Sequence, residues 1–502
     1  MKKYLPELLL SIALLAILSI TNSWKVFNYP PRSEHQWRQS DCSAYVKTYY
    51  RNNTGLFSPG TYYLGGKEGK VVSEFPLLYY LTAKIEKLVG EHYWVMRGIC
   101  FICFVSGLFA LLSCIKIWIP NAAYSILPVV LLATSPYYYF YAINFLPNVP
   151  AISFSFIGLY FFLLYRKNNR VAYLAIGTAF FLLAVLLKPT DGGIIWLAFL
   201  LTWTFQHFAG SAEKKFRTAV PMFVSGLIIV SCLLYWIRFV NSYNNQNGNH
   251  QNLVGIYPIW EMRKDIMVYT IKRVFTEWTH VFQQKIVLWF LLGCFIVFII
   301  KWKYLDSFLR LFTAFLILGV ITYAILWFKA FTDHDYYQLP YVLAAVFLSV
   351  TVVEFFVNKI LPKLPAVPKT IIAGILSVLV LMGIHHNRNI QLKRYDGRTE
   401  GGIAPAFFDL EPYLERIGIQ YSDIVVCVPD QSPNSALNAI NRYGYSEAFN
   451  NETYNINYFQ SKGASFLIIS DSSYLSNPLY QPFTKKQIGY FKGIFVFDIR
   501  KY

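Results

Sequence analysis

The sequence of 502 residues predicts an α-helical polytopic membrane protein, with about eleven transmembrane helices and a small C-terminal α/β domain. Hydrophobic residues make up 55% of the chain and charged residues only 14%, a balance that a water-exposed surface does not tolerate. Apolar runs long enough to cross a bilayer as helices recur along most of the chain. Beyond about residue 386, the apolar runs shorten to the length of strands.

The first apolar run, Leu5–Ile20, follows two lysines, and no small-residue cleavage pattern comes after it, so we interpret it as an uncleaved span. Each later run of this kind predicts one further span. These runs lie near residues 93–118, 122–141, 149–165, 171–187, 192–207, 219–240, 285–300, 308–328, 339–357 and 370–385.

Clusters of Lys and Arg fall between alternate spans and predict the orientation, because such clusters stay in the cytoplasm. The clusters are Lys2 with Lys3, residues 166–170 and 214–217, Lys301 with Lys303, and Lys359 with Lys363 and Lys369. The loops near residues 25–92, 144–148, 188–191, 241–284 and 329–337 then lie outside, together with the tail after His386. We therefore predict a transmembrane domain over 1–386, with interfacial helices at about 25–92, and an extracytoplasmic domain over 387–502.

The tail alternates short apolar runs with helical patterns, which is typical of a small α/β domain. Strands are expected at residues 423–428, 465–470 and 493–498. Helices are expected near residues 407–417, 434–443 and 453–462.

The first outer loop concentrates charged side chains immediately after a span. If the chain is helical from Gln36 onward, then Arg38, Asp41 and Tyr45 share one face, so a phosphate-binding cation and a carboxylate could meet in one cleft. Glu34 lies just before this stretch. An interfacial helix anchored by Arg and Trp explains the same residues equally well.

Three later stretches carry further polar groups on the predicted outer side. Glu74 precedes an amphipathic stretch over 77–89 that is too short and too charged to span, and Lys188 stands at the outer end of a span, where it could bind phosphate or simply reach water. The loop after the ninth predicted span joins a cation, carboxylates, an imidazole and phenols, which can bind a phosphate or a sugar. Its residues are Lys329, Asp333, His334, Asp335, Tyr336 and Tyr337.

Other chemistries find little support in the sequence. The net charge of +18 lies in short clusters between apolar runs, so we do not expect nucleic acid as a partner. Cys100 and Cys103 form a C-x-x-C inside an apolar run without a nearby His, which indicates buried thiols. No H-E-x-x-H or comparable spacing appears, so we predict no metal cofactor, although the question of a divalent ion stays open.

Five short motifs occur in an order that resembles one family. They are His35-Gln36-Trp37-Arg38-Gln39-Ser40-Asp41, Glu74-Phe75-Pro76-Leu77, Leu146-Pro147-Asn148, Lys188-Pro189, and His334-Asp335-Tyr336-Tyr337-Gln338-Leu339-Pro340. Together they resemble the bacterial class C glycosyltransferases related to protein O-mannosyltransferases and to the aminoarabinose transferase of lipid A. The resemblance covers roughly residues 1–386.

The resemblance implies an inverting enzyme of the inner (plasma) membrane that takes a sugar from a polyprenyl-phosphate donor at the extracytoplasmic face. The acceptor would be lipid A, another envelope glycan or a protein. Asp41 is the first choice as catalytic base, with Glu34 second, because many members carry an Asp-Glu pair where this chain has His35 and Gln36. Arg38, Lys188, Lys329, His334, Tyr336 and Tyr337 would bind the donor, and Glu74, Asn148 and Asp335 would position acceptor or loop.

Two other functions remain open on the sequence alone. A transporter or flippase of lipid-linked saccharides could share the span number and an outer cationic cavity, although its ionisable residues would be expected near the bilayer midplane. A non-catalytic assembly or receptor protein could use the α/β tail to bind a ligand.

Overall fold

The computed structural model describes residues 4–208, 215–249, 255–395, 402–448 and 456–500. The chain divides into two compact units. The bundle unit comprises Met1–Phe27, Arg97–Trp236 and Gly255–Lys393, and the sheet unit comprises Asn28–Met96, Ile237–Val254 and Arg394–Tyr502. The expected domain boundary near residue 386 stays a prediction, while the first outer segment groups with the tail. Lys2, Lys3 and Lys214, used above for orientation, lie outside the described residues.

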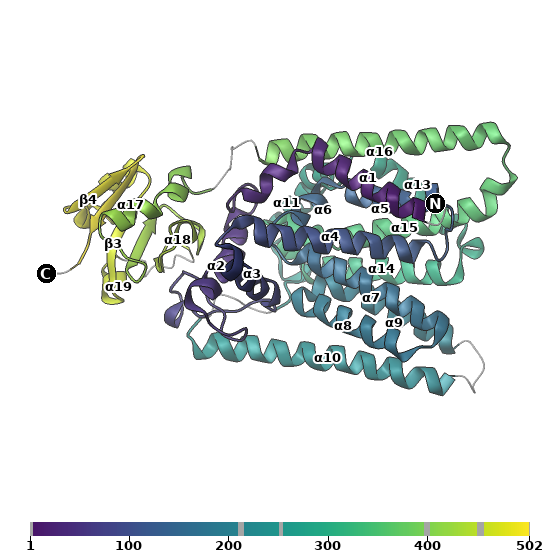
Figure 1. Cartoon of the computed structure of the whole chain (residues 1–502), viewed down its shortest axis with the longest axis horizontal. Helices are drawn as coiled ribbons and strands as arrows, with labels where there is room; N and C mark the ends of the chain where they lie inside the picture. Colours follow the sequence, from purple (N-terminus) through teal and green to yellow (C-terminus); the bar gives the residue numbers. More distant parts are fainter. Residues whose placement is uncertain (1–3, 209–214, 250–254, 396–401, 449–455, 501–502) are drawn as a thin grey trace. The chain divides into compact units, whose positions relative to one another are not determined.

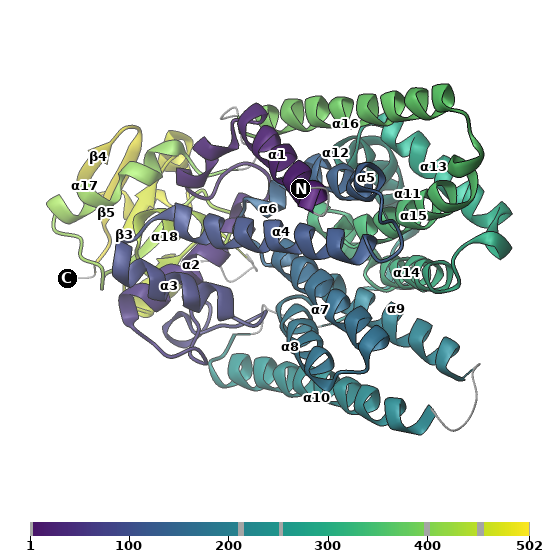
Figure 2. The same cartoon turned by 45° about the vertical axis from the view of Figure 1, so that its right-hand side comes forward.

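The bundle unit is built from helices that pack in succession. Figures 1 and 2 show its longer helices, such as α4, α14 and α16, running alongside one another. Its main helices are α1 (Leu5–Ile20), α4 (Tyr93–Ile115), α5 (Ala122–Ala133), α6 (Pro136–Ala142), α7 (Asn148–Asn168), α8 (Val171–Leu187), α9 (Pro189–Phe208), α10 (Lys215–Gln246), α11 (Lys264–Arg273), α12 (Thr279–Phe282), α13 (Lys285–Ile300), α14 (Ser307–Leu326), α15 (Tyr341–Phe355) and α16 (Ala366–Arg394). The 3-10 helices η7 (Phe328–Phe331) and η8 (Asp335–Gln338) join α14 to α15.

Close packing of α7 on α8 depends on small residues. A Cβ on Gly158 would stand 2.8 Å from the ring of Phe181, and a Cβ on Gly177 would stand 2.3 Å from the ring of Phe162. Glycine at these two positions therefore lets the helices approach, as in other membrane bundles. The packing continues from α7 and α8 to α9, from α9 to α14, and from α14 to α15.

Among the described residues, six helices are long and apolar enough to cross a membrane, or seven if the bent pair Lys264–Phe282 and Lys285–Ile300 is one span. Shorter apolar helices are α1, α5 and α8. The chain is thus a mostly helical, polytopic membrane protein. The count of about eleven spans stays a prediction.

One expected span needs correction. The run over 122–141 forms two helices, α5 and α6, instead of one. Pro136 has no N–H to continue the helical hydrogen bonds, and the side chain of Ser135 accepts the N–H of Tyr138 to start α6. Proline and an N-cap serine thus divide an apolar run that hydropathy alone reads as continuous.

The sheet unit contains the α/β tail and the first outer segment. Its five strands run in the order β2-β1-β3-β5-β4, with β1 parallel to β2 and β3, and β5 antiparallel to β3 and β4. The strands are β1 (Ile424–Val428), β2 (Gly444–Tyr445), β3 (Ala464–Ile469), β4 (Gln487–Phe491) and β5 (Ile494–Asp498). The three expected strands are confirmed, whereas β2 and β4 were not anticipated.

Both faces of this sheet are covered, which explains its continuous apolar runs. Along β1, Val425 and Cys427 face one buried cluster and Val426 and Val428 face the other. The first cluster packs on α17 (Glu411–Arg416) and α18 (Ser435–Ile440), and the second on α19 (Ile456–Ser461). Residues 453–455 of the third expected helix lie outside the described residues.

The first outer segment forms part of the same core. Helix α2 (Gln36–Asn52) packs on α3 (Leu77–Val89) and on α18. Ala44 and Tyr62 belong to the buried cluster beneath α18. The sheet unit is therefore one structure made from distant parts of the sequence, and it carries the first group of candidate site residues.

Candidate functional site

Helix α2 begins at Gln36, as the sequence predicted. His35 precedes it in the left-handed region with a φ of 53°, and the Gln39 side chain donates to the carbonyls of Arg32 (2.7 Å) and Glu34 (2.8 Å). The predicted shared face is confirmed for two residues, because Arg38 Nη1 lies 3.7 Å from Asp41 Oδ2. This turn therefore brings a cation and a carboxylate together.

Glu74 completes an ion cluster on Arg38. The Arg38 guanidinium donates to the Glu74 carboxylate, which also accepts hydrogen bonds from the hydroxyls of Ser73 and Tyr79. Tyr79 stacks on Tyr45 with ring centroids 5.3 Å apart. Burial raises the pKa of Tyr79 well above its ordinary value, so this phenol acts as a donor. We call Arg38, Asp41, Glu74 and Tyr79 the carboxylate cluster.

Asp41 is the more accessible acid of this cluster. Its side chain is 18% exposed, against 6% for Glu74. Asn434, which precedes α18, donates from Nδ2 to Asp41 Oδ1 at 2.8 Å. Burial raises the pKa of Asp41 to about 6, against the opposing effects of Arg38 and Asn434. Such a carboxyl group is ionised at neutral pH and has a raised affinity for a proton.

Glu34, the second choice as base, has a different environment. It lies exposed in the turn before α2, and its backbone carbonyl accepts the hydrogen bond from Gln39. Arg38 forms its ion pairs with Asp41 and Glu74. The structure therefore joins Glu74, expected only to position acceptor or loop, to Arg38 and Asp41, while Glu34 occupies the preceding turn.

In the bundle unit, Lys188 lies at the junction of α8 and α9. Its Nζ is 5.5 Å from the ring centroid of Tyr337, within the range of a cation–π interaction. Asp191, in the first turn of α9, is only 1% exposed and accepts hydrogen bonds from Asn148 and from Thr190. Asn148, expected to position acceptor or loop, thus lies beside a buried carboxylate.

Three rings of the loop between α14 and α15 lie together, and one of them, Tyr337, lies against Lys188. His334 stacks on Tyr336 with ring centroids 5.3 Å apart, and lies 6.0 Å from the ring of Tyr337. Asp335 accepts a hydrogen bond from Tyr141. Lys329 is exposed on η7. We call Lys188, Asp191, His334, Tyr336 and Tyr337 the lysine–aromatic cluster.

Sequence reasoning missed two residues of these clusters, Tyr79 and Asp191, and also Asn434, which donates to Asp41. Tyr79 lies in the stretch predicted to be an interfacial helix. Its position five residues after Glu74 could have indicated that the two side chains meet. Asp191 follows Lys188 closely, and a carboxylate at the end of a predicted span could have indicated it. Asn434 lies 393 positions from Asp41, so no local pattern could have joined them.

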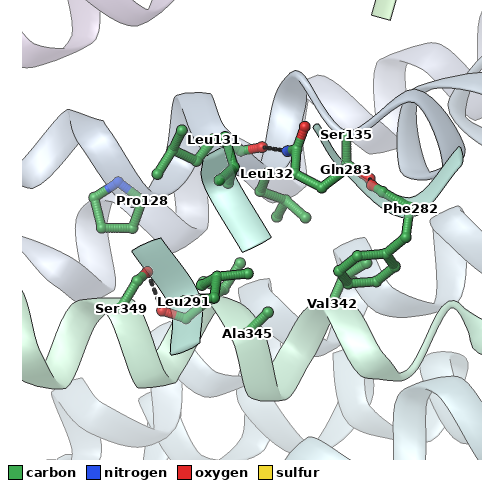
Figure 3. Close-up of a pocket in the computed structure, with 12 residues that line it drawn as sticks. Pro128, Leu131, Leu132, Ser135, Phe282, Gln283, Leu291, Val342, Ala345 and Ser349 are labelled. Atoms are coloured by element: carbon green, nitrogen blue, oxygen red, sulfur yellow. Dashed lines mark hydrogen bonds between the residues drawn. The ribbon is translucent and has the colours of Figure 1, made fainter. Parts of the chain in front are cut away.

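The bundle unit contains a pocket that is lined by no residue of either cluster (Figure 3). It is lined from α5, α12, α13 and α15 by residues such as Pro128, Gln283 and Val342, without a charged side chain. Gln283 donates to the Leu131 carbonyl at 2.9 Å. Among the described residues, no three His, Cys, Asp or Glu side chains form a group that could hold a metal ion.

Comparisons with known proteins agree with this architecture. The family model for "Dolichyl-phosphate-mannose-protein mannosyltransferase" matches residues 73–236. The structure of ArnT from Cupriavidus metallidurans bound to undecaprenyl phosphate matches with a TM-score of 0.63 and 11% identity, over 98% of this chain and 97% of that one. The likeness to ArnT shows the fold that the two chains share over nearly their whole length.

Two further solved structures have a similar fold. The arabinofuranosyltransferase AftD from Mycobacteria matches with a TM-score of 0.56 and 12% identity, over 98% of this chain and 40% of that one. The oligosaccharyltransferase of Archaeoglobus fulgidus matches with a TM-score of 0.56 and 13% identity, over 97% and 73%. No curated protein sequence matches the chain.

The family match covers only part of the candidate site. Residues 73–236 contain Glu74, Asn148, Lys188 and Asp191, whereas Arg38, Asp41, the loop from Lys329 to Tyr337, and Asn434 lie outside it. The family match therefore does not include Arg38 or Asp41. Their place in the carboxylate cluster is known only from the contacts in the structure.

Proposed function

We propose that the chain transfers a sugar from a polyprenyl-phosphate donor to an acceptor at the extracytoplasmic face of the inner (plasma) membrane. The acceptor is a lipid, an envelope glycan or a protein. The observation that carries the proposal is the carboxylate cluster, where Asp41, an accessible acid of raised proton affinity, stands beside Glu74, an acid that already accepts three hydrogen bonds. Support for the donor comes from the fold shared with ArnT bound to undecaprenyl phosphate.

Asp41 is the proposed base because it is less constrained than Glu74. Glu74 accepts from Arg38, Ser73 and Tyr79, which uses most of its acceptor capacity. Asp41 accepts from Asn434 and keeps lone pairs for an incoming proton. A carboxyl group with a pKa of about 6 is also well matched to a general base near neutral pH.

The lysine–aromatic cluster is the proposed site for the donor phosphate and sugar. Lys188 supplies a positive charge, and its carboxylate neighbour Asp191 is already held by the amide of Asn148. The rings of His334, Tyr336 and Tyr337 offer flat faces and polar edges suited to a sugar. Arg38 and Lys329 are secondary candidates, because Arg38 is already paired with two carboxylates and Lys329 is exposed.

The reaction proposed is a displacement at the anomeric carbon. The acceptor hydroxyl or amine gives its proton to Asp41 while its oxygen or nitrogen forms a bond to this carbon. The bond from the same carbon to the phosphate oxygen breaks, and the electron pair leaves with the polyprenyl phosphate, so the anomeric centre inverts. A cation beside the leaving phosphate neutralises its negative charge and lowers the barrier.

The test uses the purified full chain with a radiolabelled polyprenyl-phosphate sugar and an envelope extract as acceptor source. We expect label to appear in an acceptor. Asp41→Asn should lower the turnover number about 100- to 10,000-fold, the range for loss of a general base. Glu34→Gln is the matched control in the same loop and should retain more than about a third of the activity, because an exposed turn residue contributes little to transfer.

The outcomes separate the competing functions. Label that crosses a vesicle membrane while still attached to the polyprenyl phosphate would favour a transporter. Wild-type turnover in Asp41→Asn would refute the assignment of the base. Reporter fusions that place Asp41 and His334 on opposite sides of the membrane would refute the proposed outer location of both groups.

A further inference from the structure

Asn434 occupies a fixed position in the tail loop that follows β1. The Asp430 carboxylate organises this loop by accepting from the backbone N–H groups of Ser432 (2.9 Å) and Ala436 (2.8 Å). The Ser432 hydroxyl in turn accepts the N–H of Ser435 at 3.0 Å. Asn434 itself is only 3% exposed. Its amide is thus presented from a rigid loop at the start of α18.

The orientation of the Asn434 amide follows from its two partners. Its Oδ1 accepts the backbone N–H of Tyr63 at 3.0 Å, so its Nδ2 must point toward Asp41. The backbone on both sides of Tyr63 is also held in place. Gly444 of β2 donates its N–H to the Tyr62 carbonyl, and its own carbonyl accepts the N–H of Leu64. The donor aimed at Asp41 is therefore set by the fold of the tail.

Asp41 faces charged groups from each element packed around it. Arg38 lies on its own helix, Glu74 lies before α3, and Asp430 lies in the tail loop. The two acids disfavour ionisation of Asp41, while Arg38 and the Asn434 donor favour it. Arg38 pairs with Oδ2 of Asp41, and Asn434 donates to Oδ1. Together these two contacts fix the plane of the carboxylate.

We propose that Asn434 is a positioning residue of the transferase, by which the C-terminal α/β tail orients the Asp41 carboxylate and keeps it in its ionised form. This inference rests on the proposed role of Asp41 as base. The tail would thereby take part in the reaction itself, although it lies outside the residues that match the family model, 73–236.

The first experiment measures the pH dependence of transfer by the full chain. Asn434→Ala removes the amide that donates to Asp41 and adds no charge beside it. Loss of a hydrogen bond to a charged group should move the acid limb of kcat/KM upward by about 1 pH unit. Asn438→Ala is the matched control, since Asn438 lies on α18, is fully buried, and makes no side-chain hydrogen bond with the residues described.

The second experiment does not depend on turnover. An infrared pH titration of the full chain, with the spectrum of Asp41→Asn subtracted, follows the protonation of Asp41 directly. The midpoint should rise by about 1 unit in Asn434→Ala and stay unchanged in Asn438→Ala. An unchanged midpoint in Asn434→Ala would overturn the positioning role. A raised midpoint in a chain without transfer activity would instead support the contact and reject the proposed function.

Discussion

The two clusters of this protein combine the same kinds of group in opposite ways. In the carboxylate cluster the cation Arg38 is shared by two acids, and Asp41 stays accessible. In the lysine–aromatic cluster the acid Asp191 accepts from the neutral donor Asn148, and Asp335 beside the cluster accepts from Tyr141. Among the described residues Lys188 is not within ion-pair distance of a carboxylate, although its charge acts on Asp191, and it lies against the ring of Tyr337. One arrangement favours proton acceptance and the other favours binding of an anion.

After the loss of Asp41, the largest fall in activity is expected when the cation of the lysine–aromatic cluster is removed. Lys188→Met keeps the length of the side chain and deletes its charge. We expect the kcat/KM for the polyprenyl-phosphate donor to fall about 10- to 100-fold, the range for a lost hydrogen bond to a charged group. Donor titration of activity measures the effect.

The control for this change is another lysine of the bundle unit. Lys329→Met removes a charge that is exposed on η7, so we expect less than about a threefold change in kcat/KM. Equal losses in the two variants would show that general positive charge, and not the placement of Lys188, attracts the donor.

The pH dependence of transfer tests whether Asp41 accepts the proton. Asp41 acts as a base only when ionised, and its pKa is raised to about 6. We therefore expect kcat/KM to be constant above pH 7 and to fall about tenfold per unit well below pH 6. The residual activity of Asp41→Asn should lack this acid limb. An acid limb that persists in this variant would assign the titration to another group, such as Asp430, whose pKa burial also raises to about 6.

The smallest expected effect concerns the hydrogen bonds that occupy Glu74. Tyr79→Phe removes the phenol that donates to Glu74 and keeps the ring that stacks on Tyr45. Glu74 then interacts more strongly with Arg38. We expect kcat to fall about two- to fivefold, with the KM for the donor unchanged. A higher KM for the donor would mean that the carboxylate cluster also binds phosphate.

The sequence predicted the local structure of the site well. The spacing of Arg38 and Asp41 placed them on one helical face, and the charged stretch from Leu77 correctly indicated a separate short helix. It could not predict that Glu74, rather than Glu34, joins Arg38, because both glutamates are near a helix start and only packing of α2 on α3 distinguishes them. The roles of all these residues remain predictions until the variants are assayed.

What the sequence by itself determined is the membrane character of the chain, the places of most of its apolar helices and the chemical types available to the site. These properties follow from hydrophobic length and from the 3.6-residue period of a helix, which act over a few turns. Only the tertiary structure decided that Asn434 faces Asp41 and that Asp191 lies beside Asn148. Such contacts depend on how distant segments pack and satisfy their buried polar groups, and no spacing along the chain encodes them.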